Sequence, residues 1–228
     1  MASNLPQNCY LSGSLHEGDP TGEVEQIDSF RAYIAPPKGS KKIGKAVVLL
    51  SDIFGIFRNN QLLADEFALN GYLAILPDLF NCDQITVGDY DAKKVDMAAW
   101  ISRHTVDDIS QIPLLQTQYV VRHLKEGLLD SGYIAHPSYV TDDELGAIEG
   151  PLSVYAAEQD TIFTTLKRHS SEETLGATGQ AFQINLFSDV AHGFASRGDL
   201  TQQHVRFAKE QAFAQAVAWF GHTLQVEG

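Results

Sequence analysis

Two short, continuous runs of apolar residues set the strongest limit on the fold of this chain. Residues 46–51 read Ala-Val-Val-Leu-Leu-Ser, and residues 73–77 read Leu-Ala-Ile-Leu-Pro. Such runs, without polar residues at alternate positions, are typical of strands that are buried on both faces of a parallel sheet. Residues 60–69, between the two runs, have a helical pattern and are followed by Asn-Gly, a common helix stop. The sequence therefore predicts a strand–helix–strand unit.

The same alternation continues along the chain and predicts an α/β fold. Further strands are expected at residues 30–34, 133–136, 152–157 and 182–187, and helices at 166–175 and 205–224. Strands separated by helix-length segments form right-handed βαβ units, which place helices on both faces of a mostly parallel sheet. With 228 residues, the chain is expected to be a single domain, 1–228, in which residues 1–40 form an N-terminal arm.

The composition narrows the classes of partner. The chain has 29 acidic and 16 basic residues, a formal net charge of −13, which does not suit nucleic acid or an anionic membrane. Two cysteines do not make a disulfide framework, and no Cys/His cluster has zinc spacing. Separately, we expect no cofactor. The first residues have no features of a secretion signal. We therefore expect a cytoplasmic protein, and its oligomeric state is open.

One stretch interrupts the alternation. Residues 90–103 and residues 117–126 both have helical patterns, and only residues 104–116 lie between them. That connection has no strand-length apolar run, and it contains Pro113, which a central strand does not accommodate. Two helices are therefore predicted to follow each other where the alternation requires a strand.

Candidate functional residues follow predicted strands, because ligands of open α/β sheets bind beyond the carboxyl ends of the strands. Asp160 follows the strand at 152–157, and His192 follows the strand at 182–187. An acid and then a histidine is the chain order in α/β-hydrolase triads. There the histidine is the general base, and the carboxylate fixes its tautomer. The alternative interpretation is an aspartate in a surface turn and an unrelated loop histidine.

Several blocks of sequence resemble the dienelactone hydrolase family, and most of all its fungal members. They are Ser-Asp-Ile-Phe-Gly-Ile-Phe at 51–57, Gly-Tyr-Leu-Ala-Ile-Leu-Pro-Asp-Leu-Phe at 71–80, Ala-Ala-Glu-Gln-Asp-Thr-Ile-Phe at 156–163 and His-Gly-Phe-Ala-Ser-Arg-Gly-Asp at 192–199. The resemblance covers nearly the whole chain. It implies an α/β-hydrolase fold without a cap domain. It also implies a small-molecule substrate and a cysteine nucleophile that attacks the carbonyl of an enol-lactone or related ester, in a Cys–His–Asp triad without metal.

The resemblance also implies roles for single residues. Asp160 and His192 match the acid and the histidine of the triad. Asp52 matches an acidic residue that contacts the resting nucleophile, and the backbone N–H of Ile53 matches a donor of the oxyanion hole. Arg197 lies near an arginine that can hold a substrate carboxylate, a task that suits the bidentate guanidinium. A solvated surface charge is the alternative interpretation for Arg197.

The Gly-x-Cys-x-Gly turn that carries the family's nucleophile has no counterpart in this chain. Counting back from Tyr119 places Leu114 at the nucleophile position and Gln116 at the second glycine. The preceding strand is missing too, so that the chain is roughly twenty residues shorter here than the family pattern. The family's turn requires glycines because its backbone is strained. The residues that could substitute do not lie in such a turn: Cys9, Cys82, Thr117 and Ser138. The sequence thus predicts an α/β-hydrolase-like sheet that lacks one central strand, and it does not support ordinary cysteine-triad hydrolysis.

Three functional hypotheses follow. The first is an enzyme acting on a small lactone, ester or polyketide-type carbonyl compound, with Asp160 and His192 as an acid–base pair. The second is an inactive family member that binds a ligand. The third is a truncated or mis-spliced product, which would expose two unpaired strand edges and aggregate. His136 is either a second acid–base group or a structural histidine. The resemblance to fungal proteins makes aromatic catabolism or secondary metabolism the expected setting.

Overall fold

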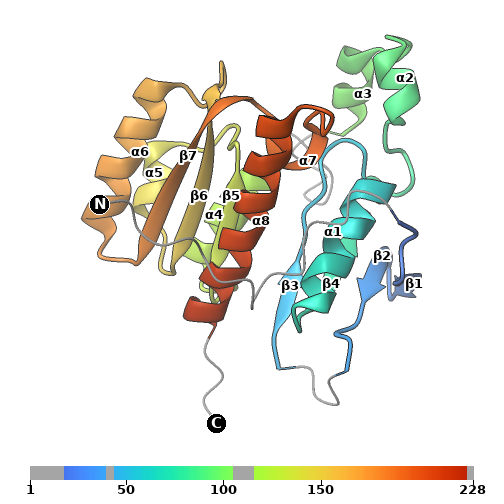
Figure 1. Ribbon diagram of the computed structural model, residues 1–228, viewed down its shortest axis with the longest axis horizontal. Helices are drawn as coiled ribbons and strands as arrows, with labels where there is room; N and C mark the ends of the chain where they lie inside the picture. Colours follow the sequence, from blue (N-terminus) through green and yellow to red (C-terminus); the bar gives the residue numbers. More distant parts are fainter. Residues whose placement is uncertain (1–17, 40–43, 105–115, 225–228) are drawn as a thin grey trace.

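The computed structural model describes residues 18–39, 44–104 and 116–224, and its strands form two sheets that lie next to each other (Figure 1). The first sheet has the order β1-β2-β4-β3, and the second has the order β5-β6-β7. The strands are β1 Glu23–Ile27, β2 Phe30–Ala35, β3 Ala46–Val48, β4 Leu73–Pro77, β5 Gly132–Ala135, β6 Leu152–Gln159 and β7 Phe182–Ala191. The pairs β3–β4, β5–β6 and β6–β7 are parallel, whereas β1–β2 and β2–β4 are antiparallel.

Helices cover both faces of the second sheet, as the sequence predicts. Val154 and Ala156 of β6 pack with α4, α5 and α6, and the alternate residues Tyr155 and Ala157 pack with α7 and α8. The helices are α1 Arg58–Leu69, α2 Val87–Asp91, α3 Met97–Arg103, α4 Gln116–Lys125, α5 Asp142–Gly146, α6 Thr165–Thr178, α7 Phe194–Arg197 and α8 Gln203–Thr223. Within the ranges given above, no helix is long and apolar enough to cross a membrane.

The long helix α8 connects the two sheets (Figure 1). Its first half packs on the second sheet through Ala208 and Ala212, and its second half packs on the first sheet through Phe220. Trp219 also donates a hydrogen bond from Nε1 to the backbone oxygen of Gly132 at the start of β5, at 3.1 Å. The helix thus holds the two sheets together by apolar contact and satisfies a carbonyl at the edge of the second sheet.

Between β3 and β5 there is a place that no strand of the described residues fills. β3 is the last strand of the first sheet, β5 is the first strand of the second, and no pairing joins them in this part of the chain. The fold is α/β-hydrolase-like, as expected. The connection predicted to lack a strand falls on residues 105–115, which lie outside the described residues, so the loss of a central strand stays a prediction.

Several elements differ from the sequence prediction, among them β3, which ends at Val48 rather than at residue 51. The single helix expected at 90–103 is two helices, because Lys93 adopts a left-handed conformation (φ 54°) and Asp96 starts a new helix by accepting the N–H of Ala99 at 3.0 Å. β1 was not predicted, since four of its five residues are exposed and it shows no apolar pattern. It pairs with β2 inside the range expected to be an arm.

Candidate active site

The carboxyl ends of β6 and β7 bring Asp160 and His192 together. Asp160 directly follows β6, and His192 directly follows β7. Because the two strands are parallel neighbours, both residues emerge at the same edge of the sheet. Nδ1 of His192 lies 2.9 Å from Oδ2 of Asp160. The Asp160 side chain is completely buried, whereas that of His192 is 21% exposed. The pair therefore has an inner carboxylate and an imidazole ring that solvent or a ligand can reach.

Asp160 is held as a carboxylate by three hydrogen bonds. Burial on its own would raise the pKa of Asp160, but the hydrogen bond from His192 and those from two backbone N–H groups outweigh it, and the pKa is lowered. The two N–H groups belong to Ile162 and Phe163 and lie 2.8 and 2.9 Å from Oδ1. A charged carboxylate only accepts hydrogen bonds. In the neutral ring, Nδ1 of His192 therefore carries the hydrogen, and Nε2 is left as a base.

Ser138 lies on the other side of the His192 ring. Its Oγ is 3.4 Å from Nε2, so that Ser138, His192 and Asp160 form a continuous series. The residue follows β5, and Thr117 of α4 holds its backbone. Thr117 Oγ1 accepts the N–H of Ser138 at 3.0 Å and donates to its carbonyl at 2.8 Å. The sequence shows that Ser138 follows a strand, but without a glycine-flanked turn nothing in it indicates contact with a residue 54 positions away.

His136, which lies in the same loop as Ser138, packs against His192. Its ring centroid lies 4.9 Å from that of His192 and 5.9 Å from that of Phe194, in both cases edge to face. The residue has a left-handed backbone (φ 39°), which is uncommon outside glycine. His136 therefore packs against the His192 ring, and its role stays a prediction.

The other predicted site residues lie in the loop after β3 and at the end of α7. Asp52 follows β3, and its Oδ1 accepts the N–H of Phe54 at 3.3 Å. Ile53 is buried, and its carbonyl accepts the N–H of Ile85 at 2.9 Å. Arg197 ends α7, five residues after His192, but its side chain is outside the described part of the structure. Their predicted roles toward a substrate stay predictions.

Cys82 lies in a different environment. It is exposed, and its Sγ is in hydrogen-bond contact with Asp78 at 3.5 Å and with the guanidinium of Arg31. The backbone N–H of Cys82 also bonds to the Asp78 carboxylate at 3.0 Å. These contacts hold the thiol in the loop after β4, and its exclusion as nucleophile stays a prediction. Cys9 and Leu114 lie outside the described residues.

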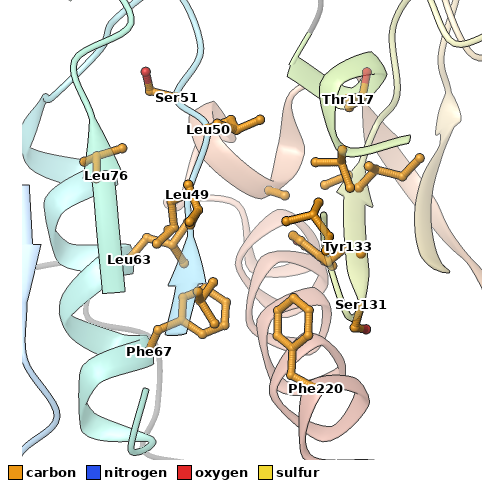
Figure 2. Close-up of a pocket in the computed structure, with 18 of the residues that line it drawn as sticks. Leu49, Leu50, Ser51, Leu63, Phe67, Leu76, Thr117, Ser131, Tyr133 and Phe220 are labelled. Atoms are coloured by element: carbon orange, nitrogen blue, oxygen red, sulfur yellow. The ribbon is translucent and has the colours of Figure 1, made fainter. Parts of the chain in front are cut away.

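A cavity of about 350 Å³ occupies the space between β3 and β5 (Figure 2). Its walls are mostly apolar and come from both sheets, from α1 and from α8: Val47, Leu49, Leu63, Phe67, Val120, Tyr133, Ile134 and Phe220. Ser51 and Thr117 lie at one end on opposite walls, and Phe67 and Phe220 lie toward the other end. Because Thr117 and His136 line the cavity and also contact Ser138 and His192, the polar end of the cavity adjoins the pair.

No metal centre is formed by the described residues, since none of their His, Cys, Asp and Glu side chains gather in groups of three or more that could hold an ion. The chemistry that this arrangement can perform is proton transfer. His192 can take a proton at Nε2, and the buried Asp160 carboxylate stabilises the imidazolium that forms. The apolar cavity beside it offers room for a small organic molecule.

A largely parallel α/β sheet with an Asp–His pair beyond neighbouring strands defines a protein of the α/β-hydrolase class. The sequence profile of the dienelactone hydrolase family matches residues 30–121 and 118–224, and the chain belongs to this family of hydrolases. Hydrolase pyvD from Aspergillus violaceofuscus is 41% identical over 247 residues, covering 99% of this chain and 100% of the relative. Hydrolase tropI from Talaromyces stipitatus is 39% identical over 254 residues, covering 99% of each chain.

Solved structures share the fold at low sequence identity. A putative dienelactone hydrolase from Klebsiella pneumoniae superposes with a TM-score of 0.64 at 15% identity, covering 84% of this chain and 92% of that one. The dienelactone hydrolase-like promiscuous phosphotriesterase P91 from metagenomic libraries gives a TM-score of 0.64 at 14% identity, covering 90% and 99%. These likenesses support the fold class.

Proposed function

We propose that this chain is an enzyme that acts on a small lactone, ester or polyketide-type carbonyl compound. The observation that carries the proposal is the contact of 2.9 Å between the buried Asp160 carboxylate and His192. In this function His192 is the general acid–base group, and Asp160 holds its tautomer. A positioned group of this kind accelerates proton transfer by about 10²–10⁴-fold.

The cavity between β3 and β5 supports the substrate class. Its volume of about 350 Å³ suits a small organic molecule. Its apolar walls suit the body of the substrate, and its polar end suits a carbonyl group close to His192. In this binding mode Asp52 lies beside the reacting group, the N–H of Ile53 donates to the oxyanion, and Arg197 holds a substrate carboxylate.

We further propose that the family's nucleophile turn, with its strand, is missing from this chain. The sequence contains no Gly-x-Cys-x-Gly, and the alignments with the fungal hydrolases, at 247 and 254 residues, are longer than the 228 residues present. The family profile matches in two parts that meet at residues 118–121, directly after the predicted site of the loss. The facing edges of β3 and β5, which pair with no strand of the described residues, support this position. The reaction therefore does not use the family's cysteine turn.

The fungal relatives support a setting for the activity. Besides the two hydrolases above, Dienlactone hydrolase 1 from Gibberella moniliformis is 29% identical over 248 residues. By analogy with these proteins, we propose that the chain works on a metabolite in fungal secondary metabolism, in the cytoplasm.

Two alternatives remain from the sequence. A member that binds a ligand without turnover is favoured by the same cavity and by the missing turn. A defective product is favoured by the edges of β3 and β5, which are unpaired in the described part of the chain, because unpaired edges promote aggregation. A soluble chain that unfolds in one cooperative transition would speak against the defective product.

The test compares hydrolysis of a dienelactone and of para-nitrophenyl acetate by the full chain and by His192→Ala. We expect the substitution to lower kcat/KM by about 10²–10⁴-fold, because it removes the general base. His169→Ala is the matched control, since His169 is an exposed histidine of α6. Turnover that is equal in the two variants would contradict the proposal. Binding of the dienelactone without any turnover would establish the ligand-binding alternative.

A further inference from the structure

We infer that Ser138 is the nucleophile of this chain and forms the covalent acyl-enzyme that a cysteine forms in the family the sequence resembles. This inference rests on the hydrolytic function proposed above. Its Oγ lies 3.4 Å from Nε2 of His192, whose Nδ1 lies 2.9 Å from Asp160. The nucleophile, the base and the orienting acid thus contact one another in this order. Without bound substrate, the distance between nucleophile and base is often longer than an ideal hydrogen bond.

The order of the three residues along the chain supports the same role. Ser138, Asp160 and His192 occur in the order nucleophile, acid, histidine, which is the order in α/β-hydrolases. Each follows a different strand of one parallel sheet, since Ser138 comes after β5, Asp160 after β6 and His192 after β7. Parallel pairing brings the three carboxyl ends to one edge, so the nucleophile has moved to the neighbouring strand end.

The loop around Ser138 holds the hydroxyl in place without glycines. His136 and Tyr139 on either side adopt left-handed conformations with φ of 39° and 59°, which forms a sharp bend after the strand. Such conformations cost energy in residues other than glycine and are concentrated at functional sites. Thr117 fixes both the N–H and the carbonyl of Ser138. The backbone polar groups are therefore occupied, and the Oγ is the group directed to His192.

Other nucleophilic side chains lack this combination. Ser51 lines the cavity and is 3% exposed, but within the described residues its Oγ has no hydrogen-bond partner and hence no base. Cys82 contacts Asp78 and Arg31. Ser138 alone among these three contacts an imidazole that is itself bound to a buried carboxylate.

The proposed reaction consumes only the ester or lactone and one water molecule. Ser138 Oγ attacks the carbonyl carbon while Nε2 of His192 takes the hydroxyl proton, and Asp160 stabilises the imidazolium. The bond between the carbonyl carbon and the leaving oxygen then breaks, and His192 returns the proton to that oxygen. In the second half, water attacks the acyl-serine and gives a proton to His192. The bond to Oγ breaks, and the proton returns to Ser138.

The first experiment labels the nucleophile directly. The full chain is incubated with a fluorophosphonate probe, and the modified residue is located by peptide mass spectrometry. We expect one adduct, on Ser138, that is absent from Ser138→Ala and at least about 10²-fold slower to form in His192→Ala. Ser102→Ala is the matched control, because Ser102 is an exposed serine of α3. An adduct on another residue, or none on the unchanged chain, overturns the inference.

The second experiment separates this inference from the proposed function. Ser138→Ala is expected to lower ester turnover by at least about 10²-fold, and adding His192→Ala should cause little further loss, because the residues of a triad act as a unit. If Ser138→Ala keeps its turnover while His192→Ala loses it, Ser138 is not the nucleophile and only the present inference fails. If Ser138 is labelled but no lactone or ester is hydrolysed, the proposed function fails instead.

A third variant tests the inference even if Ser138→Ala does not fold. Ser138→Cys preserves the size of the side chain and replaces the hydroxyl by a thiol beside the same imidazole. We expect it to melt like the unchanged chain and to react with iodoacetamide at position 138 faster than Cys82 does, because a thiol paired with histidine has a lowered pKa. Reaction at Cys82 with none at position 138 overturns the inference even if Ser138→Ala is unstable.

Discussion

The Asp160 side chain uses its two oxygens for different tasks. Oδ1 accepts the N–H groups of Ile162 and Phe163, and Oδ2 accepts from His192. The two N–H groups require an acceptor at Oδ1. In Asp160→Asn, the amide oxygen would therefore stay at that position, and the NH₂ group would face the His192 ring.

This orientation leads to a prediction for Asp160→Asn. An NH₂ group at the position of Oδ2 forces Nδ1 of His192 to accept, so the hydrogen moves to Nε2 and the base is lost. We expect kcat/KM for para-nitrophenyl acetate to fall by at least about 10²-fold while the melting temperature changes little. Asp143→Asn, at an exposed position of α5, serves as control. A variant that retains most of its activity would show that the tautomer is not set by Asp160.

At the scale of elements, the contact between α1 and α8 contains a buried acid. Glu66 of α1 and Lys209 of α8 line the same small cavity with Phe67 and Phe213. Burial raises the pKa of Glu66 to about 8. The negative charge of Glu210 adds to this increase, and the positive charge of Lys209 partly offsets it. Burial also lowers the pKa of Lys209. The interface is therefore expected to respond to pH.

The sign of the response follows from the pKa of Glu66. The folded-state pKa of about 8 lies above the unfolded value of about 4.3, so the unfolded chain ionises first. The free energy of unfolding should therefore fall as the pH rises from about 4.3 to about 8. Glu66→Gln should flatten this slope in urea denaturation, whereas Glu172→Gln, at an exposed position of α6, should not. An unchanged slope in Glu66→Gln would contradict the assignment.

Apolar patterns predicted the central elements closely and the peripheral ones poorly. The strand expected at 73–77 is β4, and the helix expected at 166–175 lies within α6. β7 continues to Ala191, four residues beyond the expected end, because its pairing with β6 continues past a bulge there. Pairing between strands is a tertiary interaction, and the polar residues at this end of β7 give no apolar pattern.

At the scale of the whole molecule, the cavity between the two sheets is the feature most open to test. Val120 of α4 lies in its wall. In Val120→Phe, the larger ring should occupy part of the cavity and hinder long acyl chains. We expect KM for a para-nitrophenyl octanoate to rise about tenfold relative to that for the acetate.

The control for this prediction is Val24→Phe, because Val24 is an exposed valine of β1 in the first sheet. Thermal melts of both variants check that the fold is retained. If Val120→Phe changes KM equally for the two esters, the cavity does not hold the acyl chain, and the substrate binds elsewhere along the site.

The sequence by itself determined the α/β class, the order of most elements, the family resemblance and the Asp160–His192 candidates. Apolar periodicity and chain order are local properties, and each can be read along one segment. The sequence also predicts that a strand is missing before α4, because a strand needs an apolar run and residues 104–116 have none.

Only the tertiary structure decided which side chains meet. The contact of Ser138 with His192 joins residues 54 positions apart, and it exists because β5, β6 and β7 pair in parallel and end at one edge. The cavity likewise exists because α8 holds two sheets whose facing strands, β3 and β5, are not paired within the described residues. Neither the pairing of distant strands nor the space left between them is encoded in any single segment of the chain.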